Sequence, residues 1–171
     1  VLNLKNEIAG LLLITYFSFA IISMPFWARK INSHGPVVIW CIAILLSLVA
    51  FIWALFLGPN DFQFFLIICS VTGFSLGAEL LCPPMILAKK VSDLGHRGHL
   101  ESSYFGVLNL FIKLSLALAS GTVLPTLSLY GYSSTGYSSS SSLVVLQFFY
   151  AGIPCFLKAV CLLAVYKYLY K

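Results

Sequence analysis

The sequence has few charged side chains. Asp, Glu, Lys and Arg make up only 9% of the 171 residues, against about 25% in a typical soluble domain. Hydrophobic residues make up 60% of the chain, and the mean hydropathy is +0.99. A soluble fold of this length cannot hide so much apolar surface from water. The scarcity of charge therefore argues against a soluble domain and predicts a protein whose solvent is the lipid bilayer.

Several chemical signatures are also missing. The only two aspartates, Asp61 and Asp93, are too far apart in the sequence for a paired-aspartate metal motif, and H-E-x-x-H, G-x-S-x-G and phosphate-binding glycine-rich loops do not occur. The five cysteines lack C-x-x-C spacing and are expected to pack as small apolar side chains. The net charge of +5 forms no patch interleaved with aromatic residues, so no nucleic acid is expected as a partner. The sequence predicts no enzyme, no metal site and no cofactor.

Long apolar segments fill most of the chain. They are residues 8–28, 36–57, 62–88, 103–129 and 143–166. Each reaches or exceeds the ~20 residues that a helix needs to cross ~30 Å of hydrocarbon. We therefore predict an all-α fold, a polytopic membrane helix bundle with five transmembrane helices in one domain, residues 1–171.

The basic residues are sorted between alternate loops. Residues 29–35, 89–102 and the C-terminal tail hold seven of the ten lysines and arginines, whereas 58–61 and 130–142 hold none. By the positive-inside rule, loops 29–35 and 89–102 are cytoplasmic and loops 58–61 and 130–142 are exterior. The N-terminus is then outside and the C-terminus cytoplasmic, in a plasma or inner membrane. A chain that starts outside and crosses the membrane five times suggests a six-helix unit that lacks its first helix.

Charged residues inside the apolar segments are the strongest functional pointers, because each is costly to place in lipid. Glu79 and Lys113 both lie roughly 14 Å from the cytoplasmic end of their helices, and these helices are consecutive and antiparallel. An ion pair between them is expected, either lining a cavity for substrate or cation or fixing helix register. Lys158 is closer to a helix end and is expected to snorkel toward the headgroups.

Small residues and prolines mark special positions along the helices. Gly73 and Gly77 form G-x-x-x-G, and Ala117 and Gly121 form a second small pair, so two helices are expected to approach neighbours closely. Prolines interrupt the predicted helices, and broken helices are typical of transporters. These prolines are Pro25, Pro83, Pro84, Pro125 and Pro154.

The cytoplasmic loop 89–102 has two interpretations. Asp93, His96 and His99 have the spacing D-x2-H-x2-H, which could hold a metal ion. The two glycines between them loosen such a site, so a solvated loop in which Arg97 contacts carboxylates is the preferred interpretation.

The same loop and its flanks resemble a known family. Residues 82–93, followed by 97–102 and the helix start at 104–106, resemble the end of the tenth helix and the next loop of glycoside–pentoside–hexuronide:cation symporters. These form the melibiose-carrier-like branch of the major facilitator superfamily. Residues 25–30 look like the exit of its eighth helix, and Lys113 matches a family lysine on the eleventh helix. Lys90 stands where the family has Asp, and Met85 where it has Trp.

The resemblance implies that the five helices correspond to helices 8–12 of such a transporter. The expected function is membrane transport by alternating access, as a fragment or split subunit, with an N-terminal transporter half on another chain as partner. The expected substrate is a sugar or glycoside and the coupling ion Na+ or H+. Lys113 and Glu79 would line the cavity, and Asp93, Arg97 and Glu101 would form charge contacts that favour one access state. The alternative is a non-transporting membrane protein, either a decayed remnant or a scaffold subunit.

Overall fold

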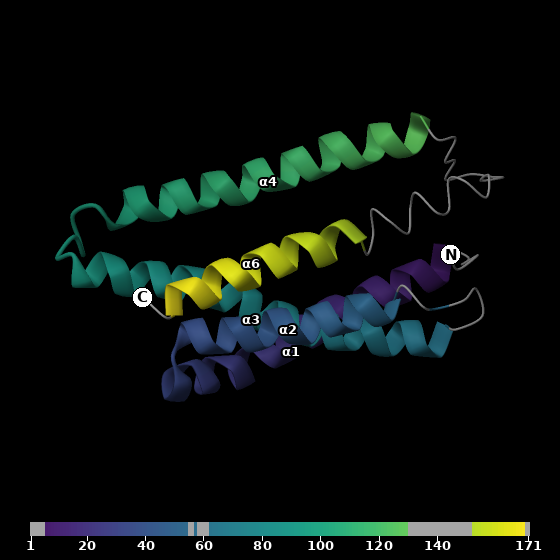
Figure 1. The fold of residues 1–171 in the computed structure, drawn as a ribbon, viewed down its shortest axis with the longest axis horizontal. Coiled ribbons are helices and arrows are strands. Elements are labelled where there is room, and N and C mark those ends of the chain that lie inside the picture. Colours follow the sequence, from purple (N-terminus) through teal and green to yellow (C-terminus); the bar gives the residue numbers. More distant parts are fainter. Residues whose placement is uncertain (1–5, 55–56, 58–61, 130–151, 170–171) are drawn as a thin grey trace. The chain divides into compact units, whose positions relative to one another are not determined.

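The computed structural model describes residues 6–54, 57, 62–129 and 152–169, and in these ranges the chain is helical apart from short connections (Figure 1). The predicted exterior loops 58–61 and 130–142 lie outside the described residues. The helices are α1 (Asn6–His34), α2 (Pro36–Ala54), α3 (Phe62–Asp93), α4 (Glu101–Leu129) and α6 (Ile153–Leu169). The predicted all-α fold is confirmed.

Four of the described helices are long and apolar enough to cross a membrane. These segments are Gly10–His34, Pro36–Ala54, Phe62–Asp93 and Glu101–Val123. The 19 residues of α2 carry no charge and span about 28 Å, close to the thickness of the hydrocarbon layer. The fifth predicted span is described only over the 17 residues of α6, so its crossing stays a prediction.

The connections between helices are made by glycines in the left-handed conformation. Gly35 has a φ of 83°, and its amide donates to the carbonyl of Ile31 at 2.8 Å, which ends α1 immediately before Pro36 begins α2. Gly95 has a φ of 73° and donates to the carbonyl of Ser92, while the His96 amide donates to that of Val91. This pair of bonds is a Schellman motif, and it ends α3.

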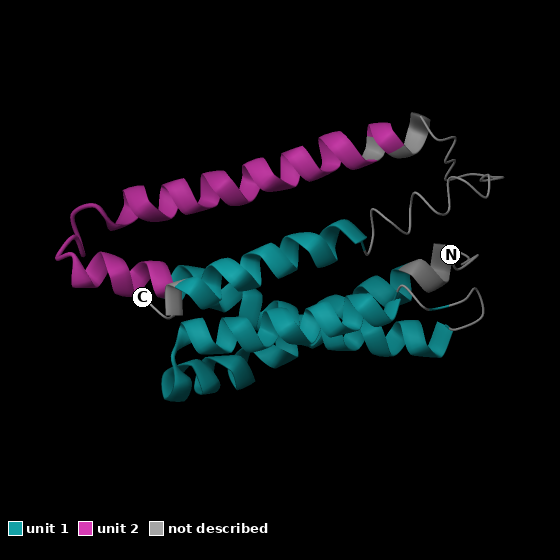
Figure 2. Ribbon diagram, in the orientation of Figure 1, with its two compact units in different colours: residues 1–85, 151–171 teal, residues 86–150 magenta. Residues whose placement is uncertain are grey.

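The chain divides into two compact units (Figure 2). Unit 1 comprises residues 1–85 and 151–171, and unit 2 comprises residues 86–150. Unit 1 contains α1, α2, α6 and the first three quarters of α3, and its helices α1 and α6 both pack against α2. Unit 2 contains the end of α3, the connection 94–100 and α4.

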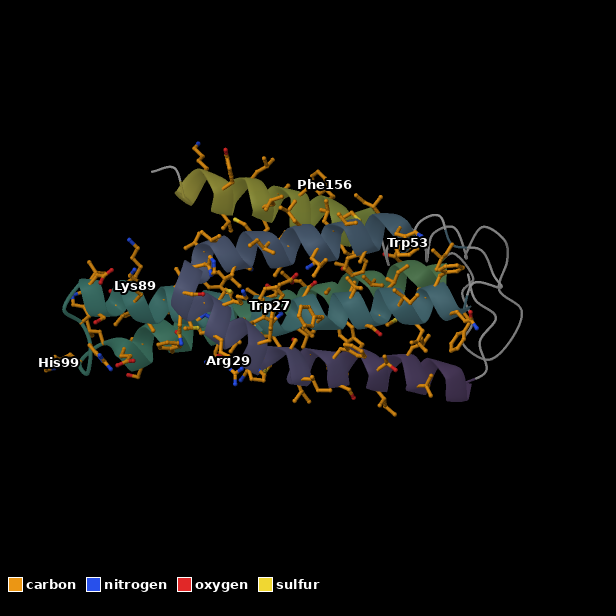
Figure 3. The ribbon with its side chains drawn as sticks, turned by 90° about the horizontal axis from the view of Figure 1, so that it is seen from below. Trp27, Arg29, Trp53, Lys89, His99 and Phe156 are labelled. Carbon is orange, nitrogen blue, oxygen red and sulfur yellow. The ribbon has the colours of Figure 1, made fainter. Side chains whose placement is uncertain are left out.

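The core of unit 1 lies where α1, α2 and α3 meet. Trp27 is 5% exposed, its indole Nε1–H donates to the carbonyl oxygen of Phe74 at 2.7 Å, and the two rings lie 5.1 Å apart. Ala78 and Cys82 of α3 are fully buried in the same cluster. Figure 3 shows Trp27 inside the bundle and Phe156 pointing away from it. Large apolar side chains such as Phe156 remain exposed on the outer faces, as lipid contact requires.

The polar side chains in unit 1 are mostly satisfied within their own helix. The Ser23 hydroxyl donates to the carbonyl of Ala20 at 2.9 Å, the Thr72 hydroxyl to that of Ile68 at 2.7 Å, and the Ser75 hydroxyl to that of Val71 at 3.0 Å. A hydroxyl bonded to a carbonyl three or four residues earlier loses little by leaving water. These residues can therefore be buried without a partner on another helix.

The predicted close approach at Gly73 and Gly77 is confirmed. A β-carbon at Gly73 would overlap the backbone carbonyl of Tyr16 on α1, and one at Gly77 would overlap the Ser23 hydroxyl and lie 2.9 Å from the Ala20 oxygen. The second small pair, Ala117 and Gly121, lies in unit 2, and its close approach to another helix stays a prediction. The small residues of α3 thus let its backbone touch that of α1.

We expect Gly73→Ala to destabilise the protein, because its methyl group meets backbone atoms that cannot move aside. Overpacking of this kind costs about 1–3 kcal/mol. Gly10→Ala is the matched control, since a β-carbon there meets nothing within 4 Å and alanine favours a helix over glycine. Thermal unfolding of both variants in detergent micelles measures the difference, and an equal midpoint for the two would contradict the contact.

Candidate functional site

The central polar feature of unit 1 is an ion pair between α3 and α6. The ammonium nitrogen Nζ of Lys158 lies 2.5 Å from Oε1 and 2.6 Å from Oε2 of Glu79. This salt bridge joins two helices that lie far apart in the sequence. Both carboxylate oxygens therefore contact the same cation, an arrangement in which each charge compensates the other in a region of low dielectric.

Two further side chains of α2 complete the surroundings of the pair. The hydroxyl of Ser47 lies 2.9 Å from Oε1 of Glu79 and 3.0 Å from the carbonyl oxygen of Ile44. A hydroxyl has one proton to donate. The Ser47 hydroxyl therefore donates to one of these two oxygens at a time, or divides its hydrogen bond between them. The ring of Phe51 lies 6.0 Å from Nζ of Lys158, within the range of a cation–π contact.

The side chains of this site come from three helices of unit 1, α2, α3 and α6. The side chains of Lys158 and Glu79 are 21% and 20% exposed. The described residues therefore cover most of the pair and leave about a fifth of each side chain uncovered.

The pair lies deep in the predicted spans. Glu79 precedes Lys89 by ten residues and Lys158 precedes Lys167 by nine, which correspond to about 15 Å and 14 Å along a helix. Both flanking lysines belong to the predicted cytoplasmic ends. The two charges therefore lie at matching depths, about halfway through ~30 Å of hydrocarbon.

The snorkelling interpretation of Lys158 is wrong, because its ammonium group is bound to Glu79 between helices. The helix continues to Leu169, further than the predicted end at 166, so Lys158 lies deeper than the sequence indicated. The equal spacing of Glu79 and Lys158 from their basic flanks is the signal that could have identified the partner. Lys158 lies on α6, whereas the prediction placed the partner of Glu79 on the helix that directly follows it in the sequence.

Lys113, the partner expected for Glu79, lies in the middle of α4 in unit 2, and its side chain is exposed. The two residues thus belong to different units. Its role in a substrate or cation cavity stays a prediction.

The three charged residues of the predicted gating loop all lie in unit 2. Asp93 is the last residue of α3, Glu101 is the first residue of α4, and Arg97 lies in the connection. They form no ion pair with one another in the described region, and their role in gating stays a prediction. The connection is ordered instead by His96, whose Nδ1 lies 3.0 Å from the Tyr104 hydroxyl while the two rings stack.

The histidines of this loop do not assemble a metal site. No group of three or more His, Cys, Asp or Glu side chains within the described residues could hold an ion. Pro83 and Pro84 lie inside α3, and the helix continues through them to Asp93. Proline has no amide proton, so the carbonyls of Glu79 and Leu80, four residues earlier, lack their helical donors.

Comparison with known protein families gives a match over the full length of the chain. The family described as MFS/sugar transport protein matches residues 1–171, the whole of this chain. No curated protein and no solved structure matches it.

Proposed function

Because the chain belongs to the family of MFS/sugar transport proteins, in the major facilitator superfamily, we propose that it transports a sugar or glycoside in symport with Na+ or H+. The family and the four long apolar helices make it an integral, multi-pass membrane protein. Within that frame, the resemblance of residues 82–106 to the melibiose-carrier-like branch supports a sugar as substrate and a cation as driving ion.

The observation that carries this proposal is the Glu79–Lys158 pair with its partial exposure. A charged side chain inside the membrane is costly to place there and usually marks a substrate or ion pathway, where its polar groups stay accessible. Sugars present several hydroxyls that both donate and accept. A carboxylate, an ammonium group and the Ser47 hydroxyl on adjacent helices can bind such a ligand by exchanging bonds with it.

In the proposed arrangement the five helices correspond to helices 8–12 of a transporter and pack against an N-terminal half carried on another chain. Substrate binds between the two halves near the midplane, and rocking of one half against the other alternates access. The N-terminus of the described helices is exterior and the C-terminus cytoplasmic. Lys113 and Glu79 line the cavity, while Asp93, Arg97 and Glu101 form contacts in one access state. No catalysed reaction is involved.

The proposal predicts uptake that depends on a cation gradient. Cells without sugar uptake of their own are supplied with this chain together with its N-terminal half, and accumulation of radiolabelled glycosides, pentosides and hexuronides is measured. We expect accumulation of at least one class under an inward Na+ or H+ gradient and its loss when an ionophore collapses that gradient. Cells with an empty vector are the control. Accumulation equal to this control for all three classes favours a scaffold subunit instead.

A further inference from the structure

The Lys158 ammonium group sits on Glu79 in the position that a bound monovalent cation would take. It contacts both carboxylate oxygens, at 2.5 and 2.6 Å. We infer that the Glu79 carboxylate is a binding site for a small monovalent cation, Na+ or H+, which Lys158 fills as a tethered cation in the present state. The inference rests on the proposed transport function, whose coupling ion it places at a specific residue.

The charge balance of unit 1 makes this exchange possible. Residues 10–28 and 36–54 contain no charged side chain, Glu79 is the only one in 62–85, and Lys158 is the only one in 153–166. When Lys158 leaves, the bundle interior therefore holds a single uncompensated negative charge. An isolated carboxylate in an apolar medium is strongly unfavourable, so it must take up a cation or a proton.

The ligand chemistry around Glu79 suits a small hard cation. Oxygen atoms are available from the carboxylate and from the Ser47 hydroxyl, which lies 2.9 Å from Oε1. The carbonyl groups of Glu79 and Leu80 lack amide donors because of Pro83 and Pro84. The helix itself continues through both prolines, so these two carbonyls can accept a ligand without unwinding of α3.

When a cation displaces the Lys158 ammonium group from Glu79, that group can move toward a neighbouring aromatic ring. The Phe51 ring lies 6.0 Å from Nζ, and the flexible four-carbon stem of Lys158 allows its charge to move onto the ring face. About a fifth of the Glu79 side chain is left uncovered by the described residues, so the carboxylate is not completely enclosed by protein. Binding and release then require a change at one lysine rather than the opening of a closed core.

Carbodiimide labelling of Glu79 tests the inference on the purified full chain, by mass spectrometry after treatment with dicyclohexylcarbodiimide. The reagent modifies neutral carboxyl groups in apolar surroundings. We expect weak labelling of the unsubstituted chain, and labelling about tenfold stronger or more in Lys158→Met, because loss of a neighbouring opposite charge favours the neutral carboxyl by at least that factor. Lys158→Arg keeps the charge and should label weakly, and Lys89→Met, which removes a lysine near the end of α3, is the matched control.

The cation is identified by comparing NaCl with choline chloride at equal ionic strength and by varying pH. Suppression of labelling in Lys158→Met by Na+ at constant pH identifies sodium. Labelling that is independent of Na+ but decreases as pH rises identifies the proton as the bound cation. Labelling no stronger than in the unsubstituted chain, or independent of both conditions, overturns the inference.

A second measurement covers the case in which Lys158→Met does not fold. In the unsubstituted chain, Na+ or Glu79→Gln should raise modification of Lys158 by an amine reagent, and no change under either condition overturns the inference. None of these readouts requires transport. A chain that labels as expected but accumulates no sugar contradicts the proposed function alone.

Discussion

Lys158→Met is expected to lower the free energy of unfolding of the bundle by about 3 kcal/mol. This value is the lower end of the range measured when one partner of a buried ion pair is removed. The lower part applies because about a fifth of each side chain is exposed. Methionine matches the length of the lysine stem, so most of the loss reflects the uncompensated Glu79 carboxylate. Chemical unfolding in detergent micelles measures the change.

The double variant Glu79→Gln/Lys158→Met should recover most of this loss, because it removes both charges and keeps the volume of both side chains. A double-mutant cycle then isolates the coupling between the residues. Lys113→Met, which removes an exposed lysine from α4, is the control and should change the unfolding free energy little. Additive effects of the two single substitutions would show that the ion pair contributes no stability.

Lys113→Ala is expected to abolish uptake while the chain still inserts into the membrane. Lys113 lies 12 residues into α4, about 18 Å along the helix, and a charge at that depth is retained for function more often than for stability. Its match to a family lysine on the eleventh helix adds to the argument. Uptake is measured in vesicles that contain the complete transporter, and insertion by the amount of chain that resists alkaline extraction.

Two controls separate charge from packing at this position. Lys113→Arg keeps the positive charge and should retain part of the uptake, whereas Lys89→Ala removes a charge from the cytoplasmic end of α3 and should have a small effect. Unchanged uptake in Lys113→Ala, at equal amounts of inserted protein, would remove Lys113 from the cavity.

The helices were predictable from hydropathy, but their ends were not. The first apolar segment was predicted to end at 28, whereas α1 continues through Arg29 and Lys30 to His34. Hydropathy reports the part of a helix that contacts lipid, and polar residues continue the helix beyond it until Gly35 stops the hydrogen-bond pattern. The third helix extends in the same way, from the predicted end at 88 to Asp93.

The site was predictable in part. Glu79 stood out because a lone carboxylate in a long apolar segment is costly, and its depth could be counted along the helix. The identity of its partner depends on which helices pack side by side, and that is set by contacts between segments far apart in the sequence. Gly73 and Gly77 indicated a close neighbour for α3 but could not identify it as α1. The start of the last predicted helix, at 143, lies outside the described residues.

The sequence separation of the ion pair has a consequence for biosynthesis. Glu79 and Lys158 are 79 residues apart, and α6 is the last described helix to leave the ribosome. The hydroxyls of Ser23, Thr72 and Ser75 find acceptors within their own helices, so these segments can enter the bilayer one at a time. The ion-pair partner of Glu79 lies on α6 instead. We therefore expect α3 to stay in the insertion machinery, or to enter the bilayer with a proton on Glu79, until Lys158 has been synthesised. A chain that terminates before α6 would leave the Glu79 carboxylate without its ion-pair partner. We expect the proteases that degrade misassembled membrane proteins to remove such a chain.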